Sequence, residues 1–400
     1  MSTHENLKND RNKLSDKIIS DEIISDKIIS DEIKSDEIKS DEIKSDEIIS
    51  DEIKSEKVEN KVIYSNEENK QRVEDKNNDE QDDIKKSDEK NEMKGDKRKT
   101  IKLDDDVNIN KIIEKISKEE PQMLTKILNL MKNDNCLNFY PLLTPYHNIE
   151  KIVDILIEEN YEYENTWCVH YDASFICQLF YEGFIPVASK QKVCKIENYE
   201  TKIYKECLLI PKIHYIRSCM HPSEIHISKK VKKKCKNFYI TIDKDFNGVM
   251  EGIVEKHGQN WLYPFVQKEF KRIFEKSVTY KNVQMHSVEV WYEDKLVAGE
   301  IGITVGSIYT SLTGFQRKNC AGTIQLCALA KLLEFQKFQL WDLGMLLPYK
   351  KEIGSKEIPM KEFFRKHRVF KFQNAEFKVP FKDKLNCSVL IKGTDNNDFD

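Results

Sequence analysis

The sequence lacks the motifs that identify most enzymes. None of its ten cysteines forms a Cys-x-x-Cys pair or stands at zinc-type spacing from a histidine, which argues against a metal site and a disulfide framework. A Gly-x-Ser-x-Gly motif and a phosphate-binding glycine loop are also missing. No leader of a secreted protein and no run of eighteen apolar residues occurs. We therefore predict a cytoplasmic protein that does not enter membranes and whose cysteines are reduced and mostly buried.

The first hundred residues contain few large apolar residues other than isoleucine. From Ser15 to Lys54 a five-residue unit such as SDEII or SDEIK is repeated eight times. A period of five matches neither helix nor strand, so the isoleucines cannot form one buried stripe. Residues 1–105 are predicted to be a disordered, low-complexity arm. An arm that docks a partner is the alternative, and the sequence names no partner for it.

Charge is nearly balanced over the chain but unevenly distributed. The formal net charge is −4, so global charge predicts no affinity for nucleic acid. The arm is rich in acidic residues, whereas 229–236 is a concentrated basic run.

Beyond the arm, apolar spacing predicts alternating helices and strands. Helices are expected on both sides of Pro121 within 108–131, at 149–159, at 173–181 before Gly183, at 246–256, at 263–276 and at 321–335. Strands are expected at 207–219, 238–242 and 339–343, and as hairpins from Met285 onward. This order predicts an α+β fold with a mixed sheet. The predicted parts are the arm (1–105), a helical linker (106–134), a small N-terminal α/β domain (135–192), a larger domain (193–375) and a C-terminal tail (376–400).

Several motifs in register resemble the bacterial leucyl/phenylalanyl-tRNA–protein transferases. They are GFIPV (183–187), HPSEIHISKK (221–230), FNGVMEGI (246–253), the NWL loop, HSVEVW (286–291), LVAGEIG (296–302), GSIY (306–309) and GSKEIP (354–359). The resemblance covers about 135–367. It implies that the larger domain is of the acetyltransferase (acyl-CoA N-acyltransferase) type. It also implies transfer of an aminoacyl group from tRNA to the α-amine of a protein or peptide, which creates an N-terminal degradation signal.

The implied chemistry agrees with the missing motifs. An aminoacyl ester is already activated, so the enzyme must hold it beside the amine, accept a proton and stabilise a developing oxyanion. We therefore expect no cofactor and no metal, with aminoacyl-tRNA as co-substrate. We also expect protein or peptide N-termini as the acceptor, and a monomer.

The resemblance assigns roles to individual residues. Asp342 matches the family's catalytic aspartate, and Trp261 matches a tryptophan that stacks on the terminal adenosine, where a stack is worth about 1–3 kcal/mol. A core tryptophan at a helix start is the alternative. The basic run would contact acceptor-stem phosphates, and the alternative is a solvated helix face. The lysines chosen for this contact are Lys229, Lys230, Lys232 and Lys233.

Three positions depart from the family pattern. Leu312 stands at a family glutamate, and Gly344 stands at a family glutamine two residues after the aspartate. Either the ribose hydroxyl of the substrate shuttles the proton, or another residue has taken over, or catalysis is lost. Glu300 replaces an apolar residue of the aminoacyl pocket, to which Gly302 is also assigned. A buried carboxylate there would favour a guanidinium, so arginine is a possible donor beside leucine or phenylalanine. Glu300 facing water is the alternative.

Two other functions compete with this prediction. An acetyl-CoA-dependent acetyltransferase needs a Gln/Arg-x-x-Gly-x-Gly/Ala loop, and here the segment from Arg317 has only Gly322. A non-catalytic module that binds tRNA or protein N-termini is favoured by Leu312 and Gly344. Assaying charged tRNAs with peptides would separate the module from the enzyme.

Overall fold

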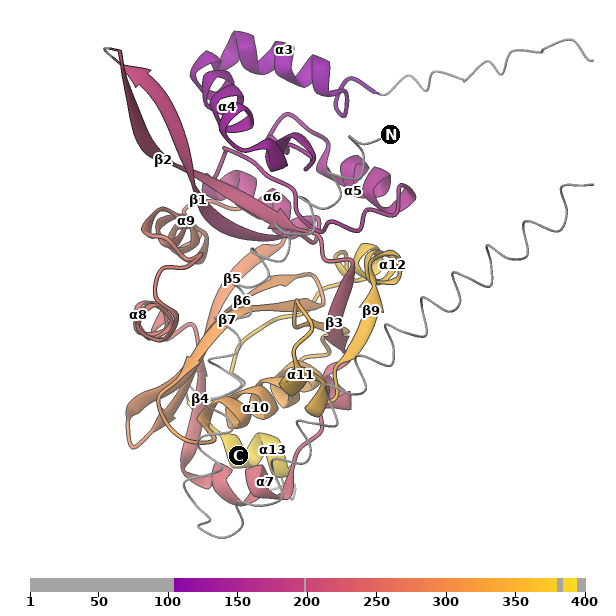
Figure 1. Ribbon diagram of the computed structural model, residues 1–400. Coiled ribbons are helices and arrows are strands. Elements are labelled where there is room, and N and C mark those ends of the chain that lie inside the picture. Colours follow the sequence, from indigo (N-terminus) through magenta and orange to yellow (C-terminus); the bar gives the residue numbers. More distant parts are fainter. Residues whose placement is uncertain (1–103, 198, 380–383, 394–400) are drawn as a thin grey trace, which may run out of the picture. The chain divides into compact units, whose positions relative to one another are not determined.

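The computed structural model describes residues 104–197, 199–379 and 384–393 (Figure 1). The predicted arm lies outside these residues except for its last two positions. All described residues belong to one compact unit.

The N-terminal part is helical and leads into a β-ribbon. Its helices are α3 (Ile109–Glu119), α4 (Pro121–Asn133), α5 (Ile149–Glu158) and α6 (Ala173–Tyr181), with a short 3-10 helix at Asn135–Asn138. The ribbon pairs β1 (Ile185–Glu197) with β2 (Glu200–Lys212) in antiparallel register throughout. In Figure 1 the ribbon extends past α4 and α9 (Pro264–Phe274).

An eight-stranded mixed sheet forms the centre of the larger part. Its order is β10-β4-β5-β6-β7-β8-β3-β9. The strands are β3 (Ile216–Met220), β4 (Phe238–Ile242), β5 (Val283–Tyr292), β6 (Lys295–Val305), β7 (Ile308–Gln316), β8 (Leu340–Asp342), β9 (Lys356–Pro359) and β10 (Leu385–Asn386). Within the described strands of this sheet, β7 and β8 pair in parallel and the other pairs are antiparallel. The predicted α+β fold with a mixed sheet is confirmed.

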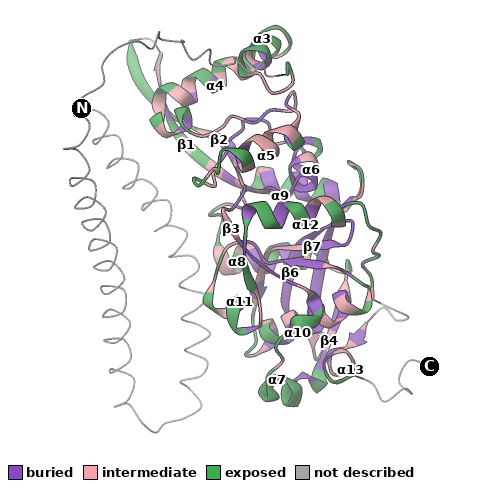
Figure 2. Ribbon diagram, turned by 90° about the vertical axis from the view of Figure 1, so that its right-hand side faces the viewer, coloured by how far each residue is buried: buried purple, intermediate pink, exposed green. Residues whose placement is uncertain are grey.

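Helices cover both faces of this sheet. One face packs against α6, α8 (Phe246–His257), α9 and α12 (Met360–Phe370). The other packs against α7 (Lys229–Lys234), α10 (Ala321–Phe335) and α13 (Cys387–Lys392). Helix α11 (Pro348–Glu352) follows β8, and 3-10 turns occupy Pro222–Glu224 and Cys235–Asn237. Figure 2 shows β6 and β7 buried between these layers, while α7 is largely exposed.

Local chemistry explains several boundaries. Asp172 caps α6 by accepting hydrogen bonds from the backbone N–H groups of Ser174 and Phe175, and Gly183 leaves the helix with φ +83°. Glu293 and Asp294 both have positive φ, as a two-residue hairpin between β5 and β6 requires.

The ten cysteines are all free, and six of them are buried. The burial confirms the prediction of mostly buried thiols, and their reduced state stays a prediction. The segment predicted to be a tail contains β10 and α13, whose buried residues Leu385, Cys387 and Ile391 belong to the core on the α10 face. The predicted domain boundaries stay predictions.

Candidate active site

Asp342 ends β8, and its side chain is almost completely buried at 1% exposure. Its Oδ2 accepts hydrogen bonds from Arg217 Nη1 at 3.0 Å and from Thr310 Oγ1 at 3.2 Å. Its Oδ1 accepts the backbone N–H of Gly344 at 2.9 Å and the Cys219 thiol at 3.8 Å. Donors from two strands, β3 and β7, and from the loop after β8 therefore fix the carboxylate in one orientation.

Arg217 supplies the counter-charge for Asp342. It lies on β3, is 1% exposed and places its guanidinium 4.1 Å from the Phe363 ring centroid. Its Nη2 donates to the Gly183 carbonyl at 3.0 Å, while its Nε has no hydrogen-bond partner among the described residues. The buried charges of Arg217 and Asp342, 3.0 Å apart, stabilise each other. Removing one of them leaves the other buried without a counter-charge.

Glu300 lies on β6, and its carboxyl group is enclosed by donors. Oε1 accepts the Tyr309 hydroxyl at 2.9 Å and the Ser311 hydroxyl at 2.8 Å, and Oε2 accepts Gln325 Nε2 at 2.9 Å. Ser311 in turn accepts the Trp341 indole N–H at 3.0 Å. Because only 4% of Glu300 is exposed, the alternative in which its side chain faces water is wrong.

Burial controls the ionisation of Glu300. Loss of solvation raises the pKa of its carboxyl group from 4.5 to about 7, although the three donors and the charge of Lys350 act in the opposite direction. The Lys350 ammonium donates to the carbonyls of Leu343 and Met345 at 2.8 and 2.9 Å, which anchors the loop after Asp342. Glu300 thus changes charge near neutral pH.

The two carboxyl groups lie on opposite faces of the sheet. Along β7, Tyr309 and Ser311 point toward Glu300, whereas the intervening Thr310 points toward Asp342. Successive side chains of a strand alternate between faces, so one strand contacts both groups from opposite sides. The structure therefore does not join Glu300 and Asp342 into one cluster of acids.

The other residues that the resemblance assigned to an aminoacyl pocket are divided between these faces. A Cβ on Gly302 would lie 2.3 Å from the Tyr309 hydroxyl oxygen, so this glycine makes room for a donor to Glu300. Leu312 sits at a β-bulge, because Ile301 pairs with Thr313 and Gly302 pairs with Ser311. Leu312 packs against the core on the α8 face.

Gly344 belongs with Asp342. Its φ of +73° is in the left-handed region, where glycine is favoured. It has no side chain to replace the family glutamine, but its backbone N–H holds the Asp342 carboxylate.

The residues predicted to bind tRNA lie at two separate places. Trp261 precedes α9, is half-buried and meets Phe270 edge-on with 6.3 Å between ring centroids. One part of its ring system thus contributes to the core and another part is accessible. The lysines of the basic run are all exposed, on α7 or directly after it; they are Lys229, Lys230, Lys232, Lys233, Lys234 and Lys236.

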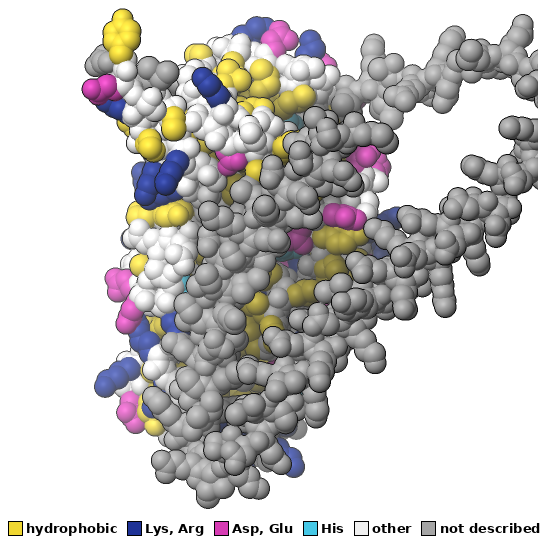
Figure 3. Space-filling model, viewed as in Figure 1, with side chains coloured by type: hydrophobic (Ala, Val, Ile, Leu, Met, Phe, Trp, Pro, Cys, Tyr) yellow, Lys and Arg dark blue, Asp and Glu magenta, His cyan; other side chains and the backbone are white. Residues whose placement is uncertain are grey.

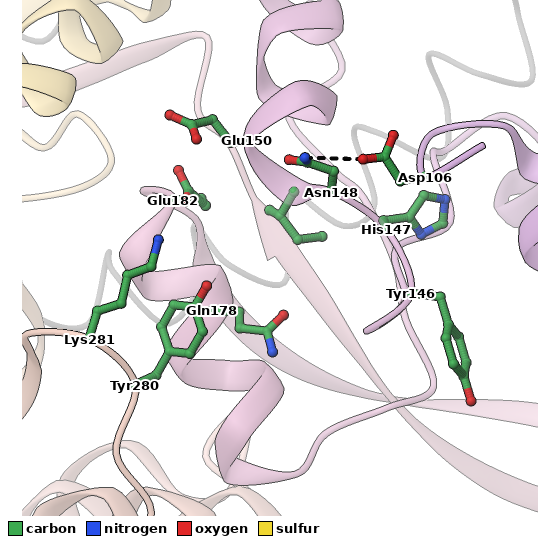
Figure 4. A pocket seen from close by; sticks show the side chains of 10 residues that line it. Asp106, Tyr146, His147, Asn148, Glu150, Gln178, Glu182, Tyr280 and Lys281 are labelled. Carbon is green, nitrogen blue, oxygen red and sulfur yellow. Dashed lines mark hydrogen bonds between the residues drawn. The ribbon is translucent and has the colours of Figure 1, made fainter. Parts of the chain in front are cut away.

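A cavity of about 400 Å³ lies elsewhere, beside α5 and α6 (Figure 4). It is lined by Asp106, Tyr146, His147, Asn148, Ile149, Glu150, Gln178, Glu182, Tyr280 and Lys281. The buried Lys371 pairs with Glu182 at 2.8 Å and with Glu150 at 3.3 Å, so these two carboxylates already have a counter-ion. None of the predicted site residues lines this cavity.

The sequence contained signals for contacts that we did not predict. Arg217 is a charged residue within an apolar strand, and Gln325 is a polar residue on the apolar face of a helix. Both are buried and each binds one of the two carboxyl groups. Polar residues at buried positions require partners, but the sequence does not say which residues these partners are.

Two further observations bear on cofactors and membranes. In the three described ranges, no group of at least three His, Cys, Asp or Glu side chains is arranged to hold a metal ion. The absence of a cofactor stays a prediction. Within the same residues, no helix has both the length and the apolar character needed to cross a bilayer.

Comparison with known proteins identifies relatives of the larger part. Residues 219–368 match the family described as leucyl/phenylalanyl-tRNA protein transferase. Proteins named leucyl/phenylalanyl-tRNA–protein transferase are similar over 152 residues: 26% identical in Azotobacter vinelandii, and 29% identical in Shewanella baltica and in Nitrosomonas eutropha. The matched segment is 37% of this chain and spans 65%, 62% and 62% of the relatives' own length, respectively.

Proposed function

We propose that the chain moves an aminoacyl group from tRNA to an N-terminal α-amine, because residues 219–368 match the leucyl/phenylalanyl-tRNA protein transferase family. The observation that carries the proposal is the placement of Asp342. It lies at the carboxyl end of β8, where it pairs with Thr310 of the parallel strand β7 and where the loop with Gly344 begins. Arg217, Thr310 and Gly344 fix its orientation there.

The reaction needs positioning more than a nucleophile. The amine attacks the ester carbonyl carbon, the new amide C–N bond forms, and the bond from that carbon to the ribose oxygen breaks. The proton lost by the amine has to reach the departing ribose oxygen. Because Gly344 and Leu312 offer no proton carrier, we assign this transfer to the neighbouring ribose hydroxyl of the substrate. Asp342 then acts by orienting the reacting groups.

Further parts of the proposal concern the fold, the tRNA contacts and the product. Strands β7 and β8 pair in parallel and are connected along the chain by α10. This arrangement is compatible with an acetyltransferase-type domain. Trp261 has an accessible part on which the terminal adenosine can stack, and the exposed lysines of α7 suit phosphates. The modified N-terminus would serve as a degradation signal in the cytoplasm, and the protein would act as a monomer without a cofactor.

The donor amino acid depends on Glu300. Its carboxyl group lies in a buried polar set with Tyr309, Ser311 and Gln325. A guanidinium can replace a hydroxyl donor, form a bidentate pair and hold the carboxyl group ionised. Leucine or phenylalanine is the donor that the resemblance implies, and arginine is the alternative, which requires the aminoacyl side chain to reach Glu300 on the face of the sheet opposite Asp342.

The activity is tested with the purified full chain, a mixture of charged tRNAs carrying labelled amino acids, and peptides with varied N-termini. Label on a peptide α-amine is the expected result and also names the donor. We expect Asp342→Asn to lower the transfer rate at least about 100-fold. If the wild-type chain binds tRNA but transfers no label, the non-catalytic module favoured by Leu312 and Gly344 replaces the enzyme.

Donor choice is tested by comparing Glu300→Met and Glu300→Gln with the wild type. Loss of a hydrogen-bonded charge pair should lower kcat/KM for arginyl-tRNA about 10- to 100-fold, corresponding to about 1.5–3 kcal/mol. Transfer from leucyl-tRNA should not fall in parallel. An unchanged ratio of the two donors in both variants would show that Glu300 does not select the amino acid.

A further inference from the structure

The outer half of the β1–β2 ribbon projects beyond the hydrophobic core. Near its base the ribbon is buried, with Leu208 and Leu209 at 0% exposure. Toward the turn its residues become exposed, and Ile203 reaches 67%. A two-stranded ribbon alone is only marginally stable in water, so this projection is not accounted for by its contribution to folding.

The two faces of the outer ribbon have different charges. Directly paired residues of an antiparallel ribbon lie on the same face. One face contains Gln191, Val193, Lys195, Lys202, Tyr204 and Glu206. The other face, here called the lysine face, contains Lys190, Lys192, Cys194, Ile203, Lys205 and Cys207. The lysine face thus has three ammonium groups and no carboxylate.

The face opposite the lysine face packs against α4. Val193 is buried there with Ile127 of α4, and the Glu206 carboxylate lies 3.6 Å from Lys126 Nζ and 3.3 Å from Lys195 Nζ. The acidic residue is therefore used for internal contacts. Among the described residues, no carboxylate forms an ion pair with Lys190, Lys192 or Lys205 of the lysine face.

Like charges are adjacent on the lysine face. Lys192 and Lys205 are exposed and directly paired across the strands. Such an arrangement destabilises a ribbon unless an anion lies over it. Lys190 is on the same strand and the same face, two residues and so about 7 Å away. Together the three lysines form a short positive row.

The lysine face continues toward the proposed site of the terminal adenosine. Lys190 Nζ lies 4.4 Å from the centroid of the Tyr263 ring, and Tyr263 is two residues from Trp261. Tyr263 also stacks with Phe265 at 5.9 Å between centroids. Figure 3 shows dark-blue and yellow side chains next to one another along the edge from which the ribbon extends. Lysines beside accessible aromatic rings are typical of surfaces that bind nucleic acid.

We propose that the lysine face of the β1–β2 ribbon binds the phosphate backbone of the tRNA whose aminoacyl end lies near Trp261. This inference rests on the proposed function for the identity of the RNA. Phosphate groups are negatively charged and attract the three lysines, whereas an acceptor peptide has a positive α-amine that the lysines repel. The ribbon lies outside residues 219–368, and in Figures 1 and 2 it lies at the opposite end of the described part from α7. The two basic surfaces can thus be tested separately.

The first test measures binding of uncharged tRNA by fluorescence anisotropy between 50 and 200 mM salt. The variant is Lys192→Gln/Lys205→Gln, and the matched control is Lys295→Gln/Lys361→Gln, which removes two exposed lysines elsewhere. From the salt dependence of phosphate contacts, each ribbon lysine should increase the affinity for tRNA about 5- to 8-fold at 0.1 M salt. The double variant should therefore bind tRNA about 30-fold more weakly than the wild type. Its salt slope should decrease by about 2. Wild-type affinity in the ribbon variant, or no tRNA binding by the wild type, overturns the proposal.

The second test separates the ribbon from the chemistry. Transfer is measured with aminoacyl-tRNA and with aminoacyl-adenosine, which has the ester but no stem. The ribbon variant should lose rate with the first donor only. A higher KM for the acceptor peptide with unchanged tRNA affinity would assign the face to the acceptor and overturn the proposal. If the wild type transfers from neither donor while the ribbon variant loses tRNA affinity, the ribbon surface stands and the enzymatic function fails.

Discussion

At Glu300 one carboxyl group accepts hydrogen bonds from three side chains on two elements, β7 and α10. These bonds satisfy its polar atoms but do not replace the solvation lost on burial, so its pKa rises to about 7. A neutral carboxyl group is easier to bury than a carboxylate. The surroundings of Glu300 therefore favour its protonated form and also fix the orientation of its side chain.

This predicts a specific pH dependence of stability. Between its unfolded pKa of 4.5 and its folded pKa of about 7, Glu300 keeps a proton that the unfolded chain has released. Its contribution to the free energy of unfolding therefore decreases as pH rises through this window and is constant above it, with a total change of about 3 kcal/mol.

Glu300→Gln does not titrate and should gain in stability relative to the wild type by up to that amount between pH 5 and pH 7.5. Urea unfolding of both proteins across this range measures the difference. Parallel curves would show that Glu300 is ionised normally in the folded protein.

At the scale of elements, β7 is the strand that organises the site. Its alternation presents Tyr309 and Ser311 to Glu300 on one face, and Thr310 to Asp342 on the other. Strand β8 lies beside it in parallel, and β3 completes the surroundings of Asp342 through Arg217. The ion pair between Arg217 and Asp342 thus links neighbouring strands that are distant in sequence.

A double-mutant cycle measures this link. Arg217→Met leaves a buried carboxylate without its partner and should reduce the free energy of unfolding by about 3–5 kcal/mol. Adding Asp342→Asn removes that charge, so the double variant should be more stable than the sum of the single effects predicts. The exposed pair of Arg317 and Glu255 is the control, because Arg317→Met should cost less than about 1 kcal/mol. Additive effects at Arg217 and Asp342 would contradict a buried ion pair.

At the scale of the whole molecule, buried histidines make the fold sensitive to acid. Burial lowers the pKa of His147 from 6.5 to about 4. The pKa of His367 falls to about 3 because of burial and the nearby charges of Lys371, Arg217 and Arg368. Both groups stay neutral in the folded protein at pH values where the unfolded chain is protonated. Their stabilising contribution is complete above pH 6.5 and is lost as pH falls toward their folded pKa values.

At pH 5 this loss should be about 2 kcal/mol for each histidine. His367→Phe keeps an aromatic ring beside Phe363 and Phe364 but removes the titrating group, so its stability should fall less between pH 6.5 and pH 5. Calorimetric or urea unfolding at each pH gives the comparison, and equal slopes for His367→Phe and the wild type would contradict the assignment.

Apolar periodicity and turn chemistry in the sequence determined most of the local structure. Helices 173–181 and 321–335 and strand 238–242 were predicted with the boundaries that the structure has, because each has a continuous apolar pattern bounded by capping or turn residues. The motifs in register predicted the resemblance that the match of residues 219–368 to the leucyl/phenylalanyl-tRNA protein transferase family supports. Residues 1–103 lie outside the described part of the chain, so the predicted arm stays a prediction.

Only the tertiary structure decided what surrounds the two carboxyl groups and where the ribbon carries its charge. Arg217 reaches Asp342 across 125 residues of sequence, and Gln325 reaches Glu300 from another element. Whether Glu300 faced water or the core depended on which layer covered β6. The lysine face exists because strand pairing places Lys192 opposite Lys205 while Glu206 turns toward α4. The local sequence determines which side chains share a face of a strand. The partner that each side chain contacts depends on long-range packing, which no local pattern specifies.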